Sequence, residues 1–161
     1  MNSTQPHPAL PIVARADILS SDAQSLIAEL NAELSAGYPE PGATHFRLAP
    51  EEVVAGTGAF FIATIDGQPS GCGAIRRLDD TSGEVKRMYV RRSQRGKGIA
   101  RAVLAALENE ARALGLSQLL LETGIRSPEA IRLYETSGFA HIEPYGEYIG
   151  SPTSVCMRKH L

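Results

Sequence analysis

The stretch KRMYVRRSQRGKGIAR, at residues 86–101, decides how this chain folds. It holds seven basic residues in sixteen positions and no acidic residue. A predicted strand over 84–90 runs into a polar loop, and Gly98 opens a helical pattern that continues through Ile99 and Val103. Free backbone N–H groups at a helix start attract anions, and glycines let an anion approach the backbone closely. The stretch therefore predicts a phosphate-binding loop between a strand and a helix.

Two familiar nucleotide-binding motifs do not fit this loop. A P-loop requires Ser or Thr after the Gly-Lys pair, whereas Gly98 follows Gly96 and Lys97. A dinucleotide fingerprint requires a further Gly or Ala, whereas Arg101 stands at that position. A solvated basic loop is the alternative interpretation. The strand before the loop and the helix after it favour the phosphate cradle.

The residues before the loop predict an antiparallel β-meander. Asp66-Gly67 separates two runs that are rich in β-branched and aromatic residues, which is typical of a hairpin. Gly71 and Gly73 allow a bend or bulge in the returning strand. The expected elements are a strand at 11–16, a helix from 20–22 to Gly37, a short helix at 49–55, and strands at 59–65, 68–78 and 84–90.

After the loop, the pattern changes to alternating helices and strands. Ser127-Pro128 is a helix start, in which the serine is expected to cap and proline suits the first helical position. The expected elements are a helix from Gly98 to Gly115, a strand at 116–122, a helix from Ser127 to Gly138, and strands at 139–142 and 154–158. The fold class is therefore α/β. We expect a mixed central sheet, built as an antiparallel meander followed by strand–helix–strand–helix–strand and flanked by helices.

Length and composition limit the number of domains and the classes of protein to which the chain can belong. The 161 residues predict one domain at 9–161 after a flexible N-terminus at 1–8. The net charge of −2 argues against a nucleic-acid partner, and no apolar run reaches the length of a membrane span. Because the N-terminus lacks signal-peptide features, a cytoplasmic protein is expected. Cys72 and Cys156 form no metal motif and are interpreted as small buried residues.

Charge is unevenly distributed along the chain. Residues 1–80 hold ten acids and four bases, and residues 81–161 hold eight acids and twelve bases. The two halves thus carry formal charges of −6 and +4. This asymmetry indicates either two different binding surfaces or scatter over solvated faces.

Two motifs resemble the GNAT acyltransferase superfamily. The segment RGKGIA at 95–100 is similar to its [RQ]xxGx[GA] motif, and AIRLYETSGF at 130–139 is similar to its AxxLYExxGF segment. The two segments occur in the family's order and on the elements that the family uses. The resemblance covers residues 84–142 closely, and the first half of the chain fits the family's order of elements.

The resemblance implies that acetyl-CoA is the acyl donor. It implies that the strands at 84–90 and 119–122 splay apart and that the CoA arm enters the gap. The backbone of the first strand pairs with that arm, and the loop amides wrap its pyrophosphate. The implied cofactor-binding residues are Met88, Tyr89, Val90, Arg95, Gly96, Lys97, Gly98, Ile99, Ala100 and Arg101.

The resemblance also implies catalytic roles. Tyr134 matches the family's tyrosine near the thioester sulfur and is expected to protonate the leaving thiolate. A backbone N–H, such as that of Val90, can stabilise the oxyanion. The general base is Glu84, Glu122 or His141, directly or through water.

One position departs from the family's pattern. Many relatives have Asn where Ser127 stands, and they use it in binding the CoA arm. The shorter Ser127 side chain leaves capping of the helix as the other role for this residue.

The implied activity is N-acetyl transfer to a primary amine of a small molecule or peptide. In the family, the helix and loop over 20–47 border the acceptor site, so Glu33 and Glu40 are expected to favour a cationic acceptor. Tyr145 and Tyr148 either wall that site or pack the late loop. The alternative function is a catalytically silent CoA-binding sensor or scaffold. Both a monomer and a homodimer are compatible with the family.

Overall fold

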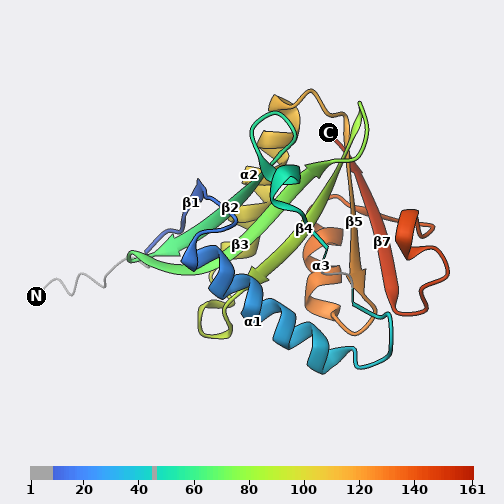
Figure 1. Ribbon diagram of the computed structural model, residues 1–161, viewed down its shortest axis with the longest axis horizontal. Helices are drawn as coiled ribbons and strands as arrows, with labels where there is room; N and C mark the ends of the chain where they lie inside the picture. Colours follow the sequence, from blue (N-terminus) through green and yellow to red (C-terminus); the bar gives the residue numbers. More distant parts are fainter. Residues whose placement is uncertain (1–8, 45–46) are drawn as a thin grey trace, which may run out of the picture.

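The computed structural model describes residues 9–44 and 47–161, and one seven-stranded sheet organises them (Figure 1). The strand order is β1-β2-β3-β4-β5-β7-β6, and the pairing of β4 with β5 is parallel whereas the other pairings are antiparallel. This is the expected mixed sheet, with a meander on one side. The strands are β1 (Ile12–Arg15), β2 (Gly58–Ile65), β3 (Gln68–Arg77), β4 (Ser82–Val90), β5 (Gln118–Gly124), β6 (Ala140–Ile142) and β7 (Ser154–His160).

Helices cover both faces of the sheet (Figure 1). Helix α2 (Ile99–Ala113) and helix α3 (Pro128–Thr136) contribute to the larger core, in which Val103, Leu107 and Tyr134 pack with buried residues of β2 to β5. Helix α1 (Ser21–Gly37) packs its buried Ala23 and Leu26 on the other face, against Phe60 and Cys72. The apolar stripe of each helix thus determines which face of the sheet it covers.

The turns that join these elements follow from local chemistry. Asp66 and Gly67 both have positive φ, 50° and 75°, as a two-residue hairpin turn requires. Ser20 caps α1, where its hydroxyl accepts a hydrogen bond from the backbone N–H of Ala23. The sequence predicted the hairpin turn and a helix start at 20–22, and the structure identifies Ser20 as the cap.

A bulge in β4 bends that strand. Cys72 pairs with Tyr89 and Ala74 pairs with Lys86, so two residues of β4 lie opposite Gly73 alone. One of these two residues, Arg87, has a φ of 59°. Because a bulged strand bends, this geometry helps to turn the end of β4 away from β5.

Three features differ from the prediction. The strand expected at 116–122 is β5 at Gln118–Gly124, because Leu116 belongs to the turn after α2. The short helix expected at 49–55 is a 3₁₀ turn, η1 (Pro50–Val53). Ser127 precedes α3, but its side chain makes no capping hydrogen bond.

Two further expectations concern the N-terminal residues and membrane-spanning helices. The N-terminal residues 1–8, which we expected to be flexible, lie outside the described residues. Within residues 9–44 and 47–161, none of the helices combines the length and apolar character needed to cross a bilayer.

Candidate active site

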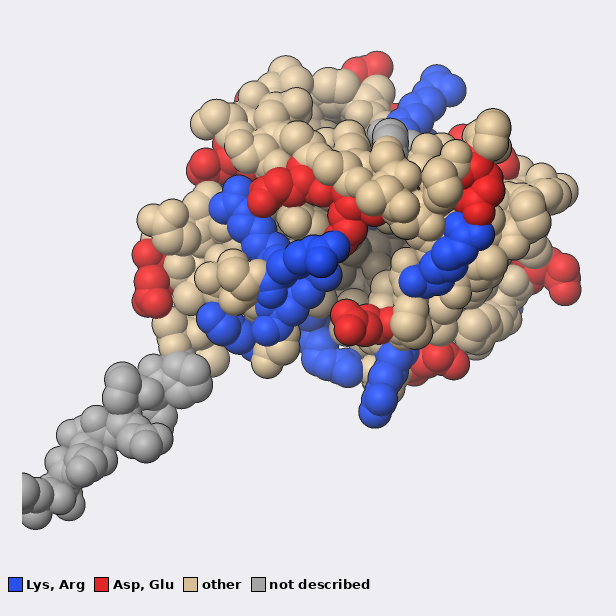
Figure 2. Space-filling model, turned by 90° about the horizontal axis from the view of Figure 1, so that it is seen from below, with Lys and Arg blue, Asp and Glu red and all other residues tan. Residues whose placement is uncertain are grey.

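The pairing of β4 with β5 ends partway along both strands. Val85 and Leu121 form the last parallel pair, although β4 continues to Val90 and β5 to Gly124. Figure 2 views the molecule from the carboxyl ends of these strands and shows a recess with basic side chains gathered beside it. Beyond this pair, the facing edges of β4 and β5 are not paired with each other. An extended ligand can therefore pair with the backbone groups on these edges.

The loop after β4 has the backbone of an anion cradle. Gly96 and Gly98 have φ values of 79° and 78°, and each has open space where a Cβ would stand. Among the described residues, no backbone N–H of residues 96–101 donates to another protein group. These free amides at the start of α2 suit a phosphate group.

Acidic residues of α1 neutralise part of the basic loop. Arg91 pairs with Glu29 at 2.9 Å, and Arg95 and Arg92 pair with Glu33 at 2.9 and 3.2 Å. The acidic first half of the chain therefore docks on the basic second half at this point. The charge asymmetry of the sequence reflects these internal contacts as well as any ligand-binding surface.

Tyr134 of α3 is buried near Glu122 of β5. Its ring packs edge-on against Phe139 at a centroid distance of 5.7 Å. Burial, followed by the negative charge of Glu122, raises the pKa of the Tyr134 phenol. Glu122 is half-buried and accepts a hydrogen bond of 2.8 Å from the Ser154 hydroxyl. The phenol thus stays protonated beside a carboxylate at the end of the sheet pairing.

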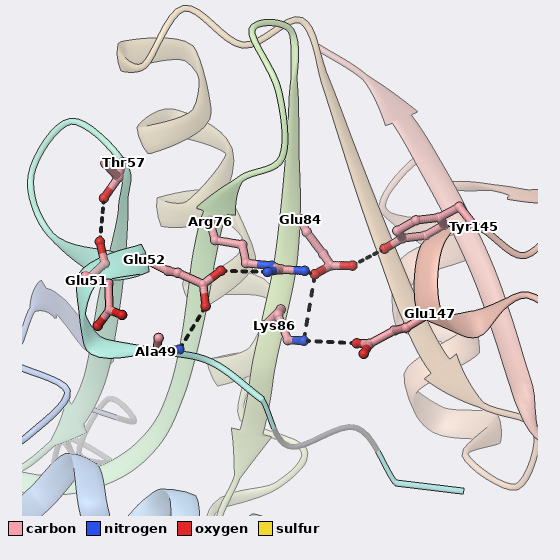
Figure 3. Close-up of polar contacts among 9 residues, drawn as sticks. All are labelled: Ala49, Glu51, Glu52, Thr57, Arg76, Glu84, Lys86, Tyr145 and Glu147. Atoms are coloured by element: carbon pink, nitrogen blue, oxygen red, sulfur yellow. Dashed lines mark hydrogen bonds and ion pairs between the residues drawn. The ribbon is translucent and has the colours of Figure 1, made fainter. Parts of the chain in front are cut away.

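Glu84 is the centre of a buried polar cluster on the α1 side of the sheet (Figure 3). One carboxylate oxygen accepts a hydrogen bond of 2.8 Å from Arg76 Nε, and the other accepts from the Tyr145 hydroxyl. Arg76 also donates to Glu52 at 2.6 Å. Burial, followed by the charge of Glu84, raises the pKa of Tyr145. Glu84 is thus fully engaged as an acceptor within the protein.

Lys86 lies in the same cluster, two residues along β4 from Glu84. Its Nζ is 3.8 Å from Glu84 Oε1 and 3.9 Å from Glu147 Oε1, both beyond hydrogen-bond distance. Within the described part of the chain, this buried nitrogen has no hydrogen-bond partner. Burial lowers the pKa of Lys86, although the neighbouring carboxylates oppose this effect.

A hollow of about 440 Å³ opens next to this cluster. A volume of this order is typical of a small-molecule site. Both basic and acidic side chains line it. The lining residues are Arg47, Ala49, Glu51, Glu52, Arg76 and Glu147.

Tyr38 ties the end of α1 to the loop after β5. Its hydroxyl lies 3.0 Å from the Ser127 hydroxyl and accepts a 2.8 Å hydrogen bond from the backbone N–H of Arg126. Arg126 also pairs with Glu40 and lies over the Tyr38 ring. Ser127 therefore contacts Tyr38 in place of capping the helix.

The remaining candidates make other contacts. Glu33 and Glu40, which we expected to face the acceptor, are both ion-paired with arginines. His141 lies on the edge strand β6, half exposed, 3.4 Å from Glu135. Burial raises the pKa of Cys72 to about 12, so its thiol stays protonated. Cys156 is also buried, as expected.

Sequence reasoning missed Arg76, Lys86 and Glu147. The spacing of Glu84 and Lys86 carried a usable signal, because alternate residues of a strand face the same side. Arg76 stands opposite Glu84 in the β3–β4 ladder, which only the register reveals. Tyr145, a residue on which the sequence left two interpretations, contacts Glu84 from the late loop.

Comparisons with known proteins agree with this geometry. Residues 23–139 match the model of the acetyltransferase (GNAT) family. An IAA acetyltransferase of Azospirillum brasilense is 39% identical over 150 residues, which cover 92% of this chain and 97% of the relative. A Klebsiella pneumoniae structure assigned as an acyl-CoA N-acyltransferase has a TM-score of 0.80 and 30% identity, covering 94% of this chain and 98% of that one.

A more distant structure shares the fold. An acetyltransferase of the GNAT family from Elizabethkingia anophelis, solved with acetyl-CoA bound, has a TM-score of 0.66 at 15% identity and covers 94% of this chain and 98% of its own. The fold and the matched relatives define an acyltransferase. The chain belongs to the acetyltransferase (GNAT) family.

Proposed function

We propose that the protein transfers an acetyl group from acetyl-CoA to a primary amine of a small molecule or peptide. The end of the β4–β5 pairing at Val85–Leu121, followed by a loop with free amides, carries this proposal. Bound acetyl-CoA supplies a thioester whose acyl carbon takes up the amine. The amides and side chains of residues 95–101 hold the pyrophosphate, and the backbone of Met88, Tyr89 and Val90 pairs with the extended arm.

The side chains at the gap then move protons. The amine attacks only as the neutral base, so a carboxylate must accept its proton, directly or through water. We assign this role to Glu122, because Glu122 is half-buried beside the Tyr134 phenol, whereas Glu84 is 1% exposed inside the Arg76–Tyr145 cluster. As the C–S bond breaks, the Tyr134 phenol donates its proton to the leaving thiolate. A backbone N–H of β4 such as that of Val90 stabilises the oxyanion. The products are the N-acetylated amine and free CoA thiol.

Thiol release from acetyl-CoA in the presence of a panel of amines tests this function. The panel contains polyamines, amino acids, aminoglycosides and short peptides, and we expect release above the rate with water for at least one class. Retention on CoA-agarose that free CoA reverses tests the cradle separately. If the protein binds acetyl-CoA tightly but turns over no amine, it is a CoA-binding sensor or scaffold and the proposed activity is wrong.

A further inference from the structure

Lys86 Nζ is a buried cation with unused hydrogen-bonding capacity. The residue is 7% exposed and its nitrogen has no hydrogen-bond partner among the described residues. Glu84 does not act as the hydrogen-bond acceptor, because its nearer oxygen, Oε1, lies 3.8 Å from Lys86 Nζ. Glu147 lies 3.9 Å away with its side chain 46% exposed. An ammonium group carries three donors, and a buried charged donor without an acceptor is unfavourable. A ligand can therefore supply the hydrogen-bond acceptor that Lys86 lacks.

The surroundings of Lys86 belong to the hollow. Figure 3 shows Lys86 between Glu84 and Glu147, on the side of the sheet where Arg76 of β3 contacts Glu52 of η1. Glu147 and Arg76 line the hollow directly, and Arg47 lines it from the loop before η1. Three cationic side chains thus lie in or beside one small space. Arg76 already pairs with Glu84 and Glu52, so Lys86 is the buried cation of this group that can accept a new carboxylate partner.

The acidic residues of the hollow are not all engaged. Glu52 accepts from Arg76 and from the backbone N–H of Ala49. Glu51 is exposed, and Glu147 keeps a half-exposed carboxylate beyond hydrogen-bond distance of Lys86. The hollow therefore offers places for a positive group as well as a negative one, which matches a zwitterion better than a polyamine.

The position of Lys86 on β4 links the hollow to the gap. Lys86 is the first residue after Val85, the last residue of β4 that pairs with β5. The Lys86 ammonium group lies near Glu84 and Glu147, so a carboxylate held by it would lie within a few residues of the point where the strands separate. An amine on the same or the neighbouring carbon of that ligand then lies at the gap as well.

We propose that the acceptor is an amino acid or a closely similar amino carboxylate, whose carboxylate binds Lys86 and the adjacent arginines of the hollow. This inference rests on the proposed acetyl transfer and adds the class of acceptor. Lys86 acts as a specificity residue, because its contact is to the acceptor's carboxylate and not to the reacting amine.

The experiment compares acids with their matched amines. Wild-type protein is assayed for thiol release from acetyl-CoA with the twenty amino acids, their C-terminal amides and the amines obtained by decarboxylation. We expect at least one amino acid to exceed its amide and its amine in kcat/KM by roughly 10- to 100-fold, the range for a hydrogen bond to a charged group. Equal or better turnover of the amides and amines would overturn the proposal.

Lys86→Met removes the ammonium group and keeps an unbranched apolar side chain that is one atom shorter. We expect the KM for the preferred acid to rise by roughly 10- to 100-fold and the preference over its amide to collapse. Lys159→Met is the matched control, because Lys159 pairs with Glu108 and lies outside this cluster; its kinetics should equal those of wild type. A fall in kcat for Lys86→Met with KM unchanged, for acid and amide alike, would assign Lys86 to the chemical step and contradict the proposal.

A binding measurement separates this inference from the proposed activity. CoA-loaded wild-type and Lys86→Met proteins are titrated calorimetrically with the same acids and amides. If no amine is acetylated but an acid binds wild type at least tenfold tighter than Lys86→Met, the carboxylate site stands and the activity is wrong. If turnover occurs but no acid depends on Lys86 for binding, the activity stands and the carboxylate site is wrong.

Discussion

Val85 of β4 and Leu121 of β5 form the last pair of the only parallel ladder in the described sheet. Lys86 on β4 and Glu122 on β5 are the next residues, and they lie just beyond the β4–β5 pairing. The bulge at Arg87 and Met88 bends β4 at the same place. The bulge and the end of the β4–β5 pairing therefore coincide, and Lys86 and Glu122 are the first residues beyond that point.

The loop glycines supply the first prediction. Gly98→Asp places a carboxylate and a Cβ where the phosphate is expected, so CoA binding should be lost. Gly115→Asp is the control, since Gly115 has φ of 76° and equally open surroundings at the other end of α2. Both variants should lose about 1–2 kcal/mol of stability through backbone strain. Calorimetry with acetyl-CoA should show loss of binding only for Gly98→Asp, and unchanged affinity in that variant would refute the cradle.

Tyr134 supplies the second prediction. Tyr134→Phe keeps the buried ring and removes the proton donor, so turnover should fall roughly 100- to 10,000-fold with CoA affinity retained. Because burial and Glu122 raise the phenol's pKa, wild type should show no loss of rate from ionisation of this group up to about pH 10. Steady-state kinetics across pH measure both effects. A phenylalanine variant as fast as wild type would exclude the acid role.

The third prediction distinguishes Glu122 from Glu84 as the general base. Glu122→Gln should lower turnover roughly 100- to 10,000-fold and leave stability nearly unchanged, because the amide still accepts from Ser154. Glu84→Gln removes the charge from a buried ion pair with Arg76 and should cost roughly 3 kcal/mol of stability. Urea unfolding of both variants measures the stability, and thiol-release kinetics measure the turnover. Together they show which glutamate is the general base. A stable Glu84→Gln protein with lost turnover would make Glu84 the base.

Tyr38 supplies a fourth prediction, on stability. Tyr38→Phe leaves the Arg126 N–H and the Ser127 hydroxyl without their shared partner, which should cost about 1–3 kcal/mol. Tyr89→Phe is the matched control, because the Tyr89 hydroxyl makes no hydrogen bond to the described residues; the cost there should stay within about 0.5 kcal/mol. Urea unfolding at pH 7 measures both, and equal stabilities of the two variants would show that the Tyr38 contacts contribute nothing.

The turn between β3 and β4 gives a prediction for pH. Hydrogen bonds from the backbone N–H groups of Thr81 and Ser82 lower the pKa of Asp79. A carboxyl whose pKa is lower in the folded state adds stability above its unfolded pKa of about 3.9, and that stability is lost as pH falls through the folded value. Asp79→Asn keeps an acceptor without the charge. The stability gap to wild type should therefore narrow between pH 6 and pH 3, and a constant gap would contradict this account.

Much of the fold follows from local sequence. The turn at Asp66-Gly67, the cap at Ser20 and the glycines at 96 and 98 each impose a local backbone conformation, so the order of elements was predictable from neighbours alone. The apolar stripe of α2 likewise fixed its buried face. The ends of the strands were harder to predict. For β5, the apolar run does not mark the residue at which pairing with the neighbouring strands begins.

The site depended on contacts between distant residues. The glycine-containing loop and the helix that carries Tyr134 were predictable from the sequence, and the spacing of Glu84 and Lys86 placed them on one face of a strand. Only the tertiary structure paired Glu33 with Arg95, brought Tyr145 to Glu84 and left Lys86 without an acceptor. Local conformation is set by neighbouring residues, whereas ion pairs and burial depend on register and on how the elements pack.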